Sequence, residues 1–174
     1  MAKYVAFLRG INVGKNTRIK MEDLRAVFEA IGFENVKTVI ASGNVIFENR
    51  TKNVSTLEKK IEDAFSRAFG FNSDSKVLKI ESLQKLVIQN PFKDIKLTSH
   101  TRLYVTFVKG KSKNKLLFPV KGKGYTMLGI YDGIVCSVID LSQGRTPDFM
   151  RELDKQWKIN TTRGWKTIER ILNS

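Results

Sequence analysis

Apolar positions in the first half of the chain form short continuous runs that alternate with longer stripes at helical spacing. Residues 4–8 are apolar at successive positions, which predicts a strand over 4–9 that is covered on both faces. Two stretches at helical spacing, 21–32 and 55–69, each end at or next to a glycine and predict amphipathic helices. Further β-rich runs predict strands at 36–41, 45–47 and 76–80. The resulting βαββαβ order is typical of a ferredoxin-like subdomain.

The second half of the chain has β-rich runs with helical stripes on either side. A short helix is predicted at 82–89, with Ser82 as its N-cap and the Asn90-Pro91 pair as its stop. A strand at 103–108 follows, and then a hairpin at 125–139 that turns at an Asp-Gly pair. These runs predict a second sheet.

The remaining pattern is helical, with one apolar stripe at 147–157 and another at 165–172. The predicted fold class is therefore α+β, with two small α/β subdomains. Residues 1–90 are predicted to form the ferredoxin-like subdomain. Residues 91–174 are predicted to form a basic subdomain in which C-terminal helices accompany a mixed or antiparallel sheet.

The charge balance favours negatively charged partners. The 174 residues include 31 Lys and Arg against 17 Asp and Glu, which gives a formal net charge of +14. Residues 93–123 contain nine basic side chains and one acid, Asp94. Such a field attracts nucleic acid or phosphorylated ligands. The alternative is that lysines in surface loops only keep the protein soluble.

Few residues are available for metal or nucleophilic chemistry. Cys136 and His100 are the single cysteine and histidine, which argues against a disulfide, a zinc site and a Ser-His-Asp arrangement. The apolar surroundings of Cys136 predict a buried hydrophobe. No cofactor and no catalytic residue are predicted, and the sequence leaves open whether the protein is an enzyme. Without a secretory signal or a membrane-length apolar run, we expect a cytoplasmic protein with no membrane partner, and the oligomeric state stays open.

The connection between the first strand and the first helix is a candidate anion site. It contains Arg9, Asn12, Lys15 and Arg18 together with two glycines. Backbone N–H groups of a glycine-rich turn before a helix can hold phosphate. The spacing differs from that of a P-loop, and Lys15 is not followed by Ser or Thr, so an NTPase is not predicted. A tight turn with solvated cations is the structural alternative.

Other polar motifs add candidates for anion binding: Ser42, Asn44, Arg145, Thr162, Arg163 and Trp165. The Ser-Gly-Asn sequence offers polar donors to a ligand, but these residue types are also favoured in turns for purely structural reasons. Arginine and indole together suit phosphate and base stacking. The alternative is that Thr161 or Thr162 caps the last helix and Trp165 belongs to its apolar face.

Three motifs in the same order resemble those of a bacterial family known as domain of unknown function 1697. The motifs are Arg9-Gly10-Ile11-Asn12-Val13-Gly14, Ser42-Gly43-Asn44-Val45 and Thr162-Arg163-Gly164-Trp165-Lys166-Thr167. The resemblance implies a cytoplasmic bacterial protein with two α+β subdomains, the first ferredoxin-like, and it implies no reaction or cofactor. The chain departs from the family pattern at Lys15, where a glycine is usual, and at Gly164, where an asparagine is usual.

Two functions therefore remain open. The first is binding of RNA or DNA phosphates by the 93–123 segment and the arginine-bearing turns, without readout of the base sequence. The second is an enzyme or sensor for a small phosphorylated or nucleotide ligand, held between the subdomains by the 9–20 connection and the Thr162-Arg163 turn. An interaction protein with no ligand is the remaining possibility.

Overall fold

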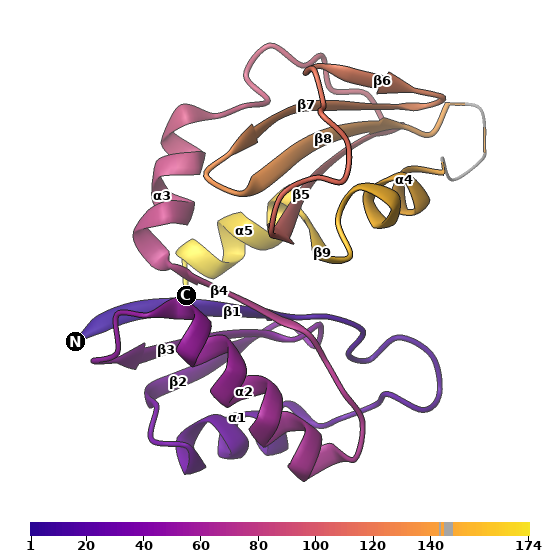
Figure 1. The fold of residues 1–174 in the computed structure, drawn as a ribbon. Coiled ribbons are helices and arrows are strands. Elements are labelled where there is room, and N and C mark those ends of the chain that lie inside the picture. The colour runs from indigo at the N-terminus through magenta and orange to yellow at the C-terminus, as the bar shows by residue number, and fades with distance from the viewer. Residues whose placement is uncertain (143, 145–147) are drawn as a thin grey trace. The chain divides into compact units, whose positions relative to one another are not determined.

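The described chain divides into two compact units. A computed structural model describes residues 1–142, 144 and 148–174. The first unit contains residues 1–83 and 170–174, and the second contains residues 84–169 (Figure 1). The predicted subdomain boundary after residue 90 stays a prediction.

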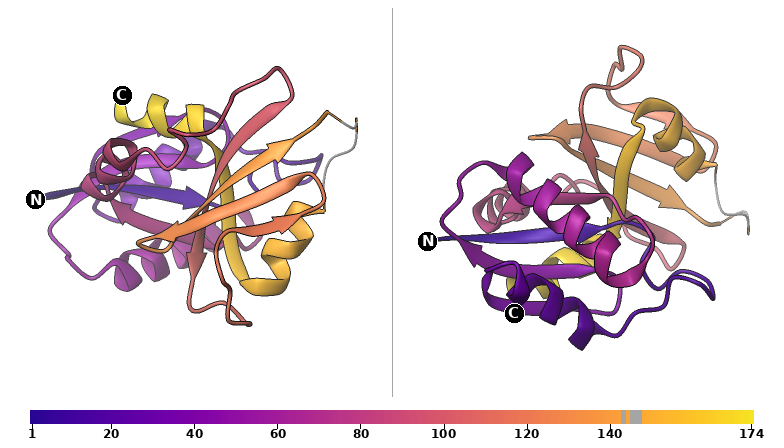
Figure 2. Two further views of the ribbon diagram at one scale, coloured as in Figure 1. Left: turned by 90° about the horizontal axis from the view of Figure 1, so that it is seen from above. Right: turned by 60° about the horizontal axis from the view of Figure 1, so that its bottom comes forward.

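The first unit has the ferredoxin-like arrangement. Its sheet has the order β2-β3-β1-β4, and every neighbouring pair is antiparallel. Helices α1 and α2 lie side by side over one face of this sheet, as Figure 1 and the right view of Figure 2 show. The elements are β1 (Ala2–Leu8), α1 (Met21–Ala30), β2 (Glu34–Val39), β3 (Asn44–Asn49), α2 (Val54–Phe69) and β4 (Ser75–Lys79). This order confirms the predicted fold class.

Strand β1 is the centre of the first core. Tyr4, Ala6 and Leu8 pack with apolar side chains of α1 and α2. Val5 and Phe7 lie at the alternate positions and are also fully buried. Because successive side chains of a strand point to opposite faces, both faces of β1 are covered, as the continuous apolar run predicted.

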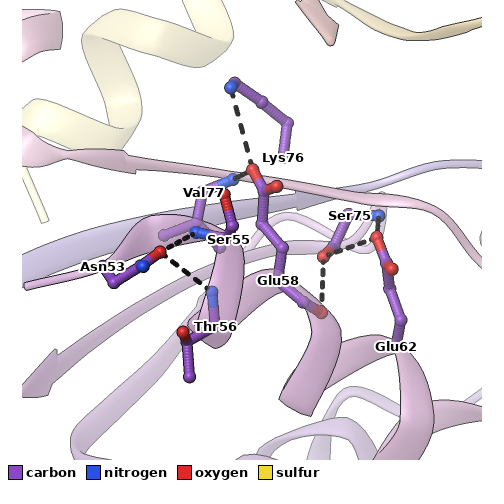
Figure 3. A network of polar contacts seen from close by, with 8 residues as sticks. All are labelled: Asn53, Ser55, Thr56, Glu58, Glu62, Ser75, Lys76 and Val77. Atoms are coloured by element: carbon purple, nitrogen blue, oxygen red, sulfur yellow. Dashed lines mark hydrogen bonds and ion pairs between the residues drawn. The ribbon is translucent and has the colours of Figure 1, made fainter. Parts of the chain in front are cut away.

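Helix α2 is attached to β4 by a network of polar contacts (Figure 3). The buried Glu58 carboxylate accepts a hydrogen bond of 2.9 Å from the Val77 N–H and lies 3.7 Å from Lys76 Nζ. One turn later, Glu62 accepts from the Ser75 N–H at 2.8 Å. Asn53 caps the start of α2 by accepting hydrogen bonds from two backbone N–H groups. The contacts of Glu58 and Glu62 hold β4 at the edge of the sheet against α2.

The second unit contains an antiparallel sheet with the order β6-β7-β8-β5-β9. Its helix α4 covers one face, where Phe149, Leu153 and Trp157 pack on Val108, Met127 and other strand residues (Figure 1). The strands are β5 (Thr101–Lys109), β6 (Val120–Gly122), β7 (Tyr125–Tyr131), β8 (Ile134–Asp140) and β9 (Ile159–Gly164), and the helix that belongs wholly to this unit is α4 (Phe149–Gln156). Two further helices, α3 (Ile80–Gln89) and α5 (Trp165–Leu172), have residues in both units. The hairpin of β7 and β8 confirms the predicted Asp-Gly turn.

Three local predictions are wrong. Ser82 is not the N-cap of α3, because this helix begins at Ile80, directly after β4. Thr161 and Thr162 do not cap the last helix; they lie in β9, where Thr162 Oγ1 is 2.8 Å from Thr106 Oγ1 of β5. The segment before α5 is therefore a strand rather than helix, because its β-branched residues pair with β5.

No helix within the described residues is both long and apolar enough to span a membrane.

Candidate nucleic-acid interface

The connection after β1 is held in place by Asn12, whose backbone is in the left-handed region (φ 57°). The Asn12 side chain donates to the Ala41 carbonyl at 2.8 Å and accepts from the Ile19 N–H at 2.8 Å. One side chain thus attaches both ends of the β1-α1 connection to the β2-β3 turn. The amide of Asn12 is used within the fold.

The Ser42-Gly43-Asn44 turn lies at the same end of the first sheet. Asn44 is fully buried, and its amide donates to the Val39 carbonyl at 2.9 Å and to Ser42 Oγ at 3.0 Å. Leu8 donates its N–H to the Gly43 carbonyl at 2.9 Å. The two motifs, which lie apart in the sequence, therefore form one set of turns, and the side-chain amides of Asn12 and Asn44 stabilise it.

The cations of this connection differ in their exposure. Lys15 and Arg18 are exposed, whereas Arg9 is half-buried at the end of β1. The Arg9 backbone donates to the Asp74 carbonyl and accepts from Ser73 Oγ. Anion binding by Arg9, Lys15 and Arg18 stays a prediction, and the exposed pair is better placed for it.

Near the C-terminus, the Arg163 side chain makes hydrogen bonds to neighbouring residues of its own strand, β9. Its Nη1 donates to Thr161 Oγ1 at 2.8 Å and to the Thr162 carbonyl at 2.9 Å. Burial lowers the pKa of Arg163 to about 10. Trp165 is half-buried and edge-on to Phe92, with ring centroids 5.0 Å apart. Arg145 lies outside the described residues.

The structure divides the basic 93–123 segment into two groups. Lys93, Lys96 and Arg102 lie before or at the start of β5, and Lys109 lies at its end. At a rise of roughly 3.3 Å per residue, Arg102 and Lys109 are about 23 Å apart along the strand. The sequence predicted the basic 93–123 segment, but the separation of its cations into two groups follows from the length of β5.

The second group contains six lysines within residues 109–123 and no acidic residue. We call this stretch the lysine segment; its lysines are Lys109, Lys111, Lys113, Lys115, Lys121 and Lys123. All of them except Lys109 are exposed. Among the described residues, none of these five exposed lysines forms an ion pair.

The lysine segment is anchored to the core of the second unit. The Lys113 N–H donates to the Gln156 carbonyl at 2.8 Å, and the Asn114 N–H donates to Gln156 Oε1 at 3.3 Å. Leu116 and Phe118 pack against the cluster beneath α4. The backbone is therefore fixed while the ammonium groups face solvent. The role of Gln156 as an anchor could not be predicted from the sequence, because a polar residue at a helix end is common.

The groups best suited to nucleophilic or metal chemistry do not form a reactive centre. Cys136 is fully buried in β8, as predicted, and burial raises the pKa of its thiol to about 12. His100 is exposed in the turn before β5. Within residues 1–142, 144 and 148–174, no group of three or more His, Cys, Asp or Glu side chains could hold a metal ion.

The two sheets and the anchored lysine segment define the chain as a two-unit α+β protein whose first unit is ferredoxin-like. Residues 1–125 match the family model described as "Protein of unknown function (DUF1697)", and the chain belongs to this family. The fold is similar to that of a solved structure, the conserved bacterial protein SP0830 from Streptococcus pneumoniae. The TM-score is 0.75 at 20% sequence identity, over 99% of this chain and 97% of that one. No curated protein is significantly similar to the chain.

Proposed function

We propose that this protein binds nucleic acid through its phosphates, and that the lysine segment is the principal contact. The observation that supports this proposal is the combination of six lysines, no acid and an anchored backbone within residues 109–123. Lysine ammonium groups are compact point charges that suit phosphate oxygens. Their attraction to a regularly charged backbone is additive and long-ranged at low salt.

Binding of this kind is independent of base sequence. The one aromatic side chain of the lysine segment, Phe118, is half-buried against the core beneath α4. Stacking on bases needs exposed aromatic side chains, and the lysine segment has none among its described residues. We therefore expect little preference between oligonucleotides of different sequence.

The test compares two variants with equal losses of charge. In the first, Lys111, Lys113, Lys115 and Lys121 are replaced by Gln. In the control, four exposed lysines outside the segment are replaced by Gln: Lys3, Lys52, Lys79 and Lys85. Each protein, purified without nucleic acid, is titrated into labelled single- and double-stranded oligonucleotides at about 50 mM salt, with fluorescence anisotropy as the readout.

We expect the wild-type protein to bind with micromolar or tighter affinity. The lysine-segment variant should bind at least about a hundredfold more weakly, because four phosphate contacts are lost. The control variant should lose less than about tenfold, from the change of net charge alone. Absence of wild-type binding at this salt, or equal losses in the two variants, would contradict the proposal.

A further inference from the structure

A separate cavity of about 880 Å³ lies in the second unit, at the end of β5 opposite the lysine segment. Pairing of β9 with β5 stops at the Tyr104–Gly164 pair, where the chain turns into α5. Residues 101–103 of β5 therefore have no β9 partner. Residues 90–99 and the first turn of α5 form the other walls.

One wall of the cavity is a fixed aromatic surface. Trp165 is half-buried, and its indole is held edge-on by Phe92 at 5.0 Å and 73°. Phe92 itself is 5% exposed. Tyr104 contributes a second half-buried ring from the strand side. An aromatic face held in one orientation is suited to stack a planar ring.

The same cavity is lined by Lys93, Arg102 and Lys166 against one acid, Glu169. The Arg102 guanidinium is oriented by Nη1, which donates to the Ser99 carbonyl at 2.8 Å and the Thr101 carbonyl at 3.0 Å. Its remaining N–H groups have no hydrogen bond to another described residue. A guanidinium oriented in this way can present two donors to a phosphate.

We propose that this cavity binds a small ligand with a planar aromatic ring and a phosphate, which is the chemistry of a mononucleotide. The ring lies against Trp165, and the phosphate lies among Lys93, Arg102 and Lys166. The volume is within the range of roughly 300–1,000 Å³ that small-molecule sites occupy. Neither the residues nor the location coincide with the lysine segment, so this site does not depend on nucleic-acid binding.

The test uses isothermal titration calorimetry with four probes: AMP, GMP, adenosine and inorganic phosphate. We expect at least one of the two nucleotides to bind the wild-type protein at least about tenfold more tightly than either adenosine or phosphate. Arg102→Gln and Trp165→Leu should each weaken nucleotide binding at least about tenfold, which corresponds to about 1.4 kcal/mol. Lys52→Gln, at an exposed position outside the cavity and the lysine segment, is the control and should leave nucleotide binding unchanged.

Thermal unfolding of each variant shows whether it folds. Arg102 is exposed, so its replacement is expected to leave the fold intact. If Trp165→Leu is unstable, the nucleotide affinity of Arg102→Gln alone tests the proposal. Absence of binding of both nucleotides at millimolar concentration would overturn the proposal. Equal affinity of folded Arg102→Gln and the wild type would also overturn it. Loss of oligonucleotide binding in the lysine-segment variant, with AMP or GMP binding retained, would separate the two sites.

Discussion

Two segments of this protein are both rich in cations and glycine but have different structural roles. The 9–20 connection follows β1 and the lysine segment follows β5, and each contains cations near glycine. In the first, Asn12 is bonded to the backbone at two places and supports the turns around it. In the second, five lysines are exposed on a fixed backbone. The Asn12 amide of the 9–20 connection thus stabilises local structure, whereas the exposed lysines of the lysine segment provide surface charge.

The largest effect expected from this comparison is on stability, at Gly43. Its φ is +77°, and an added Cβ would lie 3.2 Å from Leu8 Cβ and 3.0 Å from Ile11 Cδ1. Gly14 has nearly the same φ (+79°), and nothing lies within 4 Å of its added Cβ. We expect Gly43→Ala to lower the free energy of unfolding by about 3 kcal/mol, from strain and overpacking, and Gly14→Ala by about 1 kcal/mol, from strain alone.

Urea denaturation followed by circular dichroism measures both values. Equal losses in the two variants would mean that the close contact of Gly43 with Leu8 and Ile11 does not constrain the turn.

The next effect is at Asn44. Replacement by Ala removes its bonds to the Val39 carbonyl and Ser42 Oγ in a fully buried position. We expect the free energy of unfolding to fall by about 2 kcal/mol. Asn16→Ala, at an exposed position of the 9–20 connection, is the control and should change it by less than about 0.5 kcal/mol.

Asn44→Ala should also leave oligonucleotide affinity unchanged once the folded fraction is accounted for. A fall in affinity of the fully folded variant would instead assign the Ser42-Gly43-Asn44 turn a direct role in binding.

The smallest effect concerns the two exposed cations of the 9–20 connection. Replacement of Lys15 and Arg18 by Gln should weaken oligonucleotide binding by about threefold, well below the loss expected from the lysine segment. The reason is that removal of two cations costs fewer phosphate contacts than removal of the four lysines replaced in the lysine-segment variant. Anisotropy titration at about 50 mM salt measures this loss. A loss as large as that of the lysine-segment variant would reverse the ranking of the two segments.

Much of the fold was predictable from local patterns, because the elements of the first unit have clear apolar periods and glycine stops. Strand β9 was not, because two threonines before a helix match an N-cap as well as a strand, and only pairing with Thr106 distinguishes them. Strand β6 has three residues, which is too short for a periodic signal.

The candidate site was less predictable than the fold. Anion binding by Arg163 stays a prediction, and its local sequence shows neither the pairing opposite Val105 nor the burial that lowers its pKa to about 10. The anchor of the lysine segment depends on Gln156, which lies more than 40 residues from Asn114 in the sequence. Local sequence patterns contain no information about contacts of this range.

The central claim is that the lysine segment binds nucleic-acid phosphates, and the salt dependence of binding tests it most directly. Dissociation constants for one double-stranded oligonucleotide are measured between about 50 and 200 mM salt, for the wild type and the variant that lacks four lysines of the segment. We predict that the slope of log affinity against log salt becomes shallower by about 3 to 4 in the variant, at roughly 0.9 per lost contact. An unchanged slope would show that these lysines do not contact phosphate and would contradict the account.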